Sequence, residues 1–338
     1  MKLIALLLVL FFSLWGESNP TVETKKIKIA ILSSPAIIGK YTQSTYNVAL
    51  ATLMAFHKPF ELTAYTLPDE SKEAITQVLE KIKLDQIDAI LAPLTLGGVK
   101  NLLALQTTTT PIFIPTVHKR DSGTAPENIL FGAIDYQAQI QALVPYMANS
   151  LAVFYDASPV GLALSRETQT IASEAKKGAK SSTLYSVDTS GSNIAKYAAN
   201  PSAFTKKSIV IHLPIVKTSM LVAQLTFSGA REQNILSTQI NFDPTLISLT
   251  QYKDRKNMIV ANSIIEQIPA IYETNELMNN DLTFDWINYT TSVGIDYLNA
   301  SLREEEREYS MQMVDSQIIY PVELMRPKEF GFEPLNGK

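Results

Sequence analysis

The sequence predicts an α/β protein made of two Rossmann-like lobes with parallel sheets, joined by a hinge that the chain crosses several times. Two observations support this fold class. Short apolar segments alternate with helical patterns along residues 27–134, and a second series of the same kind follows without a break. The chain has 338 residues, which is enough for two domains with a sizeable core each.

The first lobe is expected to contain five strands. Residues 27–32, IKIAIL, form an apolar run that ends at two serines and a proline, as a strand buried on both faces of a sheet would. Four further segments are interpreted as strands: 61–66, 88–93, 112–115 and 129–134. The helical patterns between the strands favour parallel pairing, because parallel neighbours need a crossover connection.

Helices of the first lobe are indicated by apolar positions at helical spacing. The first helix has a stripe made of Tyr46, Ala49, Leu50, Leu53 and Met54. A second helix opens at 69–71 and repeats apolar residues at Ile75, Val78, Leu79 and Ile82. Thr95, followed by two glycines, leads into a third helix.

The second lobe repeats this alternation. A helix with its apolar face at Ile140, Leu143, Val144 and Met147 precedes the first strand of this lobe. Strands are expected at 151–156, 181–187, 208–213 and 234–240. Helices are expected at 159–177 and 216–227.

The remaining segments set the domain boundaries. Residues 245–250 and 258–263 suit crossings back to the first lobe, and a helix over 283–307 and a strand over 317–322 follow. We therefore expect lobe 1 to comprise 26–134 plus about 250–302, and lobe 2 to comprise 135–249. The C-terminal tail, 303–338, is rich in Met, Tyr and Pro. It either docks on a partner, or packs back across the hinge or covers a lobe.

Composition excludes several classes of function. The net charge of −4 and the pI near 5.6, without basic clusters, argue against nucleic acid as a partner. The chain has no cysteine, so disulfides, thiol catalysis and Cys-ligated metals are ruled out. The lipid-modified cysteine of a bacterial lipoprotein is ruled out as well.

The N-terminus predicts export. Lys2 is followed by an apolar run over 3–12 and small residues at 16 and 18, which is typical of a cleavable signal peptide at 1–18. An uncleaved anchor is the alternative. No later segment is long and apolar enough to span a membrane, so the mature chain is expected in the periplasm without a membrane span.

Catalytic and metal-binding motifs do not emerge from the sequence. His57, His118 and His212 are not at metal-ligand spacing, and His212 lies in an apolar strand, as a core histidine would. The S-x-x-K match at 173–176 has no partner motifs. We therefore expect no enzyme activity, no catalytic residue, no metal and no cofactor.

Several segments resemble the type I periplasmic binding proteins, the fold of leucine-binding proteins and of receptor ligand-binding regions. They cover about 27–300 and include APLT at 92–95, IPT at 114–116 and GIDYL at 294–298. The last segment and the strand openings are also similar to the periplasmic domain of the outer-membrane activators of penicillin-binding proteins, which are lipoproteins.

The resemblance implies a ligand cleft between the lobes, at the carboxyl ends of strands. The expected lining consists of Ser33, Ser34, Thr95, Leu96, Thr116, Val117, Tyr155 and Asp156. If the ligand is an amino acid, the resemblance implies that Thr95 and Thr116 bind its carboxylate and that Tyr155 supplies an aromatic contact. Asp156 or Asp243 would then bind its ammonium group. The alternative for each hydroxyl is a helix cap or turn.

Two functions remain open. The first is an exported protein that binds a small amino-acid-like or peptide solute in the cleft for transport or sensing, closing its lobes around a hinge. The second is a non-enzymatic scaffold or regulator of the cell envelope, which keeps the fold without a small ligand and binds an envelope protein. Both are inferred from fold resemblance.

Overall fold

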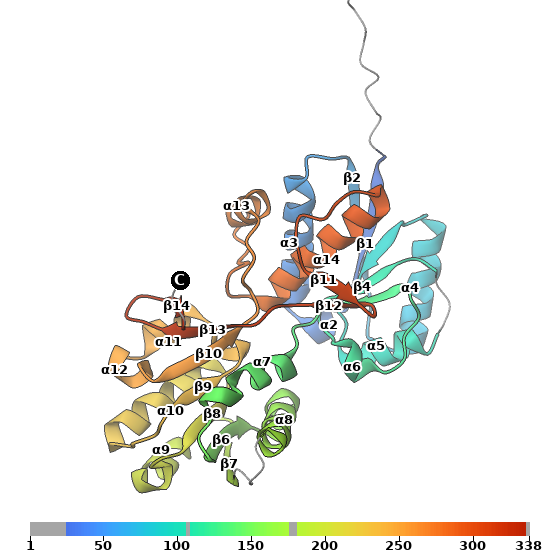
Figure 1. Cartoon of the computed structure of the whole chain (residues 1–338). Helices are drawn as coiled ribbons and strands as arrows, with labels where there is room; N and C mark the ends of the chain where they lie inside the picture. Colours follow the sequence, from blue (N-terminus) through green and yellow to red (C-terminus); the bar gives the residue numbers. More distant parts are fainter. Residues whose placement is uncertain (1–24, 106–108, 176–180, 336–338) are drawn as a thin grey trace, which may run out of the picture.

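The computed structural model describes residues 25–105, 109–175 and 181–335, which form two lobes joined by three chain segments (Figure 1). The signal peptide predicted at 1–18 lies outside the described residues, as does part of the S-x-x-K segment. Within the described ranges, no helix is long and apolar enough to cross a membrane.

The first lobe contains a seven-stranded sheet in the order β11-β12-β5-β4-β3-β1-β2. Its five N-terminal strands were predicted from the sequence and pair in parallel: β1 (Ile27–Ser33), β2 (Phe60–Thr66), β3 (Ala89–Leu91), β4 (Ile112–Ile114) and β5 (Ile129–Phe131). Two short strands near the C-terminus, β11 (Gln312–Val314) and β12 (Gln317–Ile319), complete it.

Strand β1 shows why this sheet has helices on both faces. Side chains of a strand alternate between its two faces. Ile29 and Ile31 belong to one buried cluster, whereas Ala30 and Leu32 belong to another. The first cluster includes α3 (Tyr41–Ala55), α13 (Pro269–Leu277) and α14 (Trp286–Arg303), and the second includes α4 (Lys72–Leu84) and α5 (Leu96–Leu103). Two short helices, α2 (Pro35–Ile38) and α6 (Lys119–Ser122), follow β1 and β4.

The predicted stripe of the first helix is partly wrong. Ala49 and Leu53 of α3 are buried as expected, but Met54 is 47% exposed. Val48 and Thr52, which the pattern left out, are fully buried, because α3 packs against both α13 and α14.

The second lobe contains a seven-stranded sheet in the order β14-β13-β10-β9-β8-β6-β7. Its strands are β6 (Ser150–Asp156), β7 (Ser181–Val187), β8 (Ser208–His212), β9 (Ile235–Ser237), β10 (Met258–Asn262), β13 (Glu323–Pro327) and β14 (Phe332–Pro334). Its helices are α7 (Tyr136–Leu143), α8 (Pro159–Glu174), α9 (Ile194–Ala198), α10 (Ile215–Ser228), α11 (Pro244–Leu249) and α12 (Tyr252–Arg255). Three 3-10 turns join them: η1 (Val144–Tyr146), η2 (Pro201–Phe204) and η3 (Gln239–Asn241).

Two expectations about the lobe boundary are wrong. Residues 245–250 do not cross back to the first lobe but form most of α11. Strand β10 pairs in parallel with β9, with Met258 opposite Ile235, so residues 250–262 belong to the second lobe rather than to the first. The physical reason is that β10 is buried along its whole length, which its place between β9 and β13 in the second sheet provides.

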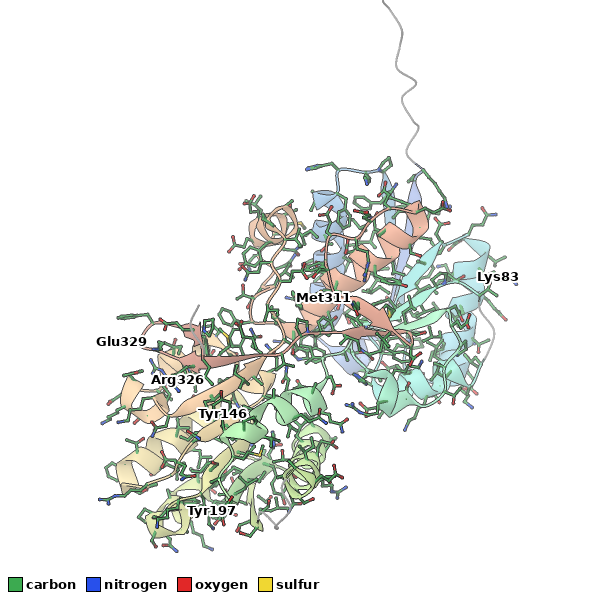
Figure 2. The ribbon with its side chains drawn as sticks, viewed as in Figure 1. Lys83, Tyr146, Tyr197, Met311, Arg326 and Glu329 are labelled. Atoms are coloured by element: carbon green, nitrogen blue, oxygen red, sulfur yellow. The ribbon has the colours of Figure 1, made fainter. Side chains whose placement is uncertain are left out.

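The C-terminal residues are not a separate tail but complete both sheets. Strands β11 and β12 join the first sheet, and β13 and β14 join the second. Figure 2 shows Met311 beside the first lobe and Arg326 on the second. The turn after α14 is held by the Asp296 carboxylate, which accepts N–H bonds from Glu308 (3.1 Å) and Tyr309 (3.0 Å). Of the two alternatives for this segment, packing back across the hinge is confirmed.

Buried amides fix two of the three crossings between the lobes. The Gln139 side chain donates to the Ser263 hydroxyl (2.8 Å) in the second crossing and accepts from the Gln239 N–H (2.9 Å). The Gln317 amide donates to the Ala133 carbonyl (3.2 Å) in the first crossing. Gln317 lies in β12, the last strand of the first sheet before the chain makes its third crossing. The hinge is therefore built from hydrogen-bonded strand ends rather than from a single flexible linker.

Candidate functional site

The predicted site residues follow the carboxyl ends of strands in both lobes. Figure 1 shows α2, α5 and α6, which follow β1, β3 and β4, on the side of the first lobe toward the second. This is where open α/β sheets place ligands. The carboxyl ends of β1, β3 and β4 therefore lie on the side of the first lobe toward the second, and the polar side chains of Thr95, Thr116 and Asp156 are already bonded within the chain.

Thr95 is the N-cap of α5 and is paired with a buried carboxylate that the sequence analysis did not place in the site. Glu70 is 6% exposed and accepts hydrogen bonds from the Thr95 N–H (3.0 Å) and from the Thr95 hydroxyl. The same hydroxyl accepts from the Gly98 N–H (3.2 Å). A Cβ at Gly98 would collide with the Glu70 carboxylate, so this glycine leaves room for it. The N-terminus of a helix favours an anion, and at the start of α5 the Glu70 carboxylate takes this position.

The other predicted residues of this edge differ in what they offer. The Thr116 hydroxyl donates to the Leu94 carbonyl (2.5 Å), which makes it a turn group rather than a free ligand donor. Val117 is wrong as a lining residue, because it is 6% exposed and packs in the core cluster around α4 and α5. Leu96 is 39% exposed, so the first residue of α5 presents an apolar side chain.

Ser33 and Ser34 end β1 and are both buried. The Ser33 carbonyl accepts from the Leu67 N–H (2.9 Å), which ties β1 to the end of β2. Ser34 precedes α2 but makes no side-chain cap, and in the described part of the chain its buried hydroxyl has no hydrogen-bond partner. Among the residues predicted for the first lobe, Ser34 has a side-chain hydroxyl without a partner in the described ranges. The residue is 0% exposed, so a ligand would reach this hydroxyl only after the surrounding residues move.

In the second lobe, both candidates for an ammonium are committed elsewhere. Burial alone would raise the pKa of Asp156, but bonds from Ser158 (N–H, 3.2 Å) and Lys217 (Nζ, 3.3 Å) hold it below its usual range. Asp243 accepts from the Thr245 N–H (2.7 Å) and caps α11. The half-buried Tyr155 lies in the same strand, one residue before Asp156.

A charged group at the first crossing was only partly anticipated. Asp135 caps α7, and its carboxylate pairs with the Arg120 guanidinium (2.9 Å) and lies 3.6 Å from Nε2 of His118. Burial lowers the pKa of His118 below its usual value, although Asp135 opposes this shift. His118 was recognised as a residue after a strand end, but its partners are 2 and 17 positions away and share no motif. The group joins α6 of the first lobe to α7 of the second.

His212 is a core histidine, as its apolar strand indicated. It is 1% exposed, and its Nε2 lies 2.7 Å from the Thr168 hydroxyl of α8. Burial lowers its pKa to about 3, so the ring is neutral at pH 7. It contributes to packing between β8 and α8 rather than to the region between the lobes.

Among the comparisons with known proteins, only the search of solved structures finds matches. A scan against protein-family models and a search of curated protein sequences find no match. Among solved structures, the chain is similar to a putative branched-chain amino acid ABC transporter from Rhodospirillum rubrum, with TM-score 0.71 and 10% identity over 92% of this chain and 100% of that one.

Two further neighbours have different functions in their titles. LivJ of Streptococcus pneumoniae, a substrate-binding protein in complex with isoleucine, matches with TM-score 0.63 and 14% identity over 91% of this chain and 98% of that one. The C-domain of LpoA from Haemophilus influenzae, described as a regulator of PBP1A, matches with TM-score 0.60 and 10% identity over 91% and 99%. The chain has the type I periplasmic binding protein fold.

Proposed function

We propose that this protein is a non-enzymatic binding protein of the cell envelope that keeps the two-lobed fold as a scaffold or regulator and does not bind a free amino acid between its lobes. The periplasm is its proposed location, reached by means of the signal peptide expected at 1–18. An amino-acid ligand needs donors for its carboxylate and an acceptor for its ammonium, and the chain uses both kinds of group internally.

The Glu70 carboxylate at the start of α5 is the observation that carries the proposal. It occupies the backbone N–H and hydroxyl of Thr95, the residue expected to bind a ligand carboxylate. A second carboxylate brought to this point would lie against Glu70, and like charges in a partly desolvated place repel strongly. Asp156, expected to bind an ammonium, is likewise neutralised by Lys217.

Solute binding remains the second candidate, and two observations favour it. The hydroxyl of Ser34 is buried and has no partner within the described ranges, and Tyr155 of the second lobe is half-buried after a predicted strand end. The likeness to LivJ with bound isoleucine supports this alternative, as the likeness to the LpoA C-domain supports the first. A solute of this kind would have to lack a free carboxylate at the α5 end.

Thermal unfolding of the purified protein with a panel of solutes tests the proposal. The panel holds free amino acids, peptides, nucleosides, sugars and muropeptides. A ligand at 100 times its dissociation constant adds about 2.7 kcal/mol to the stability, which is a shift of several degrees. We expect no shift with any free amino acid. A shift that Thr95→Ala and Tyr155→Ala abolish would replace the proposal by the solute-binding function.

A further inference from the structure

Helix α10 is apolar on its solvent face as well as on its buried face. Leu221, Val222 and Leu225 face the core of the second lobe. The opposite face carries the residues that we call the α10 stripe: Val216 (55% exposed), Met220 (41%), half-buried Ala223 and Phe227 (89%). At 100° per residue these four positions fall within about 60° of one another on the helix surface. A surface helix normally presents polar side chains there, so the fold of the lobe itself does not explain the stripe.

Three residues of the stripe, Val216, Met220 and Ala223, line a groove. It has a volume of about 470 Å³ and runs along α10 between α9 and α11. Its apolar walls include Ile194 and Ala195 of α9 and Leu249 of α11, which is 51% exposed. Figure 1 shows α10 on the outer side of the second lobe, away from the first. The stripe and the groove together form an exposed apolar surface of the kind that marks protein–protein contacts.

Among the described residues, those of the stripe and of the groove lining include no charged side chain. Within α10, Lys217 is the one charged residue, and its ammonium lies 3.3 Å from the Asp156 carboxylate with 15% of the side chain exposed. It is therefore neutralised and turned away from the stripe. Two such surfaces can approach each other without bringing like charges together, whereas a strongly charged partner would gain nothing from this face.

The order of residues in the stripe is self-complementary. In an antiparallel pair of α10 helices related by a two-fold axis, Phe227 stands opposite Val216 of the other copy, and Met220 stands opposite Ala223. The larger side chain meets the smaller one at each level, which is the arrangement that lets facing side chains interdigitate.

We propose that the α10 stripe is a dimerisation surface that takes a second copy of this chain, with the two α10 helices packed antiparallel about a two-fold axis. Four side chains and a groove on each side make a small interface, in the class that gives weak complexes. The dimer therefore forms in a concentration-dependent way. This surface lies away from the region between the lobes, so the proposal stands independently of the proposed function.

Sedimentation velocity of the purified protein tests the proposal. From roughly 1 to 300 µM, the range of a weak dimer, the sedimentation coefficient of the wild type is expected to rise from the monomer to the dimer value. Met220→Asp should remain monomeric at every concentration. Leu277→Asp is the matched control, because Leu277 is 88% exposed on α13 of the first lobe, and it should dimerise as the wild type does. A monomeric wild type, or a dimer that Met220→Asp leaves intact, overturns the proposal.

Cross-linking gives a second measurement that does not depend on weakening the interface. The chain has no cysteine, so an intermolecular disulfide can form only at introduced residues. The double variant Met220→Cys/Ala223→Cys should give a covalent dimer on mild oxidation, and Leu277→Cys should not. A dimer through Leu277→Cys alone, or none through the α10 pair, contradicts the antiparallel arrangement. An unchanged melting temperature of each variant confirms that it is folded.

Discussion

Removing the Glu70 carboxylate tests most directly whether this side chain occupies the anion-binding position at the start of α5, or whether that position is open to a ligand. Glu70→Ala deletes the acceptor for the Thr95 N–H and hydroxyl, while Glu70→Gln keeps the shape of the side chain and removes its charge. Glu73→Gln is the matched control, because Glu73 is exposed in the first turn of α4.

The expected magnitude follows from the bonds. A hydrogen bond to a charged group contributes about 1.5–3 kcal/mol, and the favourable position at a helix N-terminus adds about 0.3–1 kcal/mol. Glu70 is 6% exposed, so solvent screens these interactions only weakly. We expect Glu70→Ala to lose about 2–4 kcal/mol of unfolding free energy and Glu70→Gln about 1–2 kcal/mol. Each kcal/mol corresponds to about 2–4 °C of melting temperature.

Chemical rescue makes the assay specific. If Glu70 fills an anion position, acetate should raise the melting temperature of Glu70→Ala and leave the wild type unchanged, because the vacated N–H and hydroxyl of Thr95 can then bind the added carboxylate. Chloride at equal ionic strength is the control for salt effects. The reasoning is refuted if Glu70→Ala is as stable as Glu73→Gln, or if acetate stabilises the wild type as much as the variant.

Two further predictions concern the cores of the lobes. Gly294→Ala should lower the unfolding free energy by about 1–3 kcal/mol in denaturant titrations, because the new Cβ would collide with the Phe113 ring. Gly97→Ala is the control, because a Cβ at this helical glycine meets nothing within the described residues closer than 3.7 Å. The folded-state pKa of His212 lies at about 3, below its usual 6.5, so the stability it contributes is present above pH 6.5 and is lost as the pH falls toward 3. Replacing it by Asn should flatten this part of the pH–stability curve, and an unchanged curve would show that the ring is not held neutral.

The sequence predicted local features well, because their causes are local. Apolar runs such as 27–32 became buried strands, and Ser71 and Thr95 cap the helices that they were expected to open. A cap depends on residues two or three positions away, so a single stretch of sequence contains all the information.

Features that depend on distant residues were missed. The segment 258–262 suits a crossing between the lobes until its pairing with β9 and β13 is known. Strands β12 and β13 pair with β5 and β10, which lie more than 60 residues earlier, and β11 and β14 join the sheets as their hairpin neighbours. In the candidate site, the sequence places Glu70 at the start of a helix and does not predict its contact with Thr95. Its meeting with Thr95, 25 positions later, depends on how β2 and β3 flank β1. Hydroxyl residues at strand ends are easy to identify in a sequence. Whether a distant side chain already bonds to their hydroxyl and N–H groups is visible only in the structure.

A crystal structure of the protein grown with a high concentration of isoleucine would test the central claim most directly. We expect the Glu70 carboxylate on the Thr95 N–H at about the 3.0 Å seen here, with no amino acid at the start of α5. Isoleucine with its carboxylate on Thr95, and Glu70 rotated away, would contradict the account.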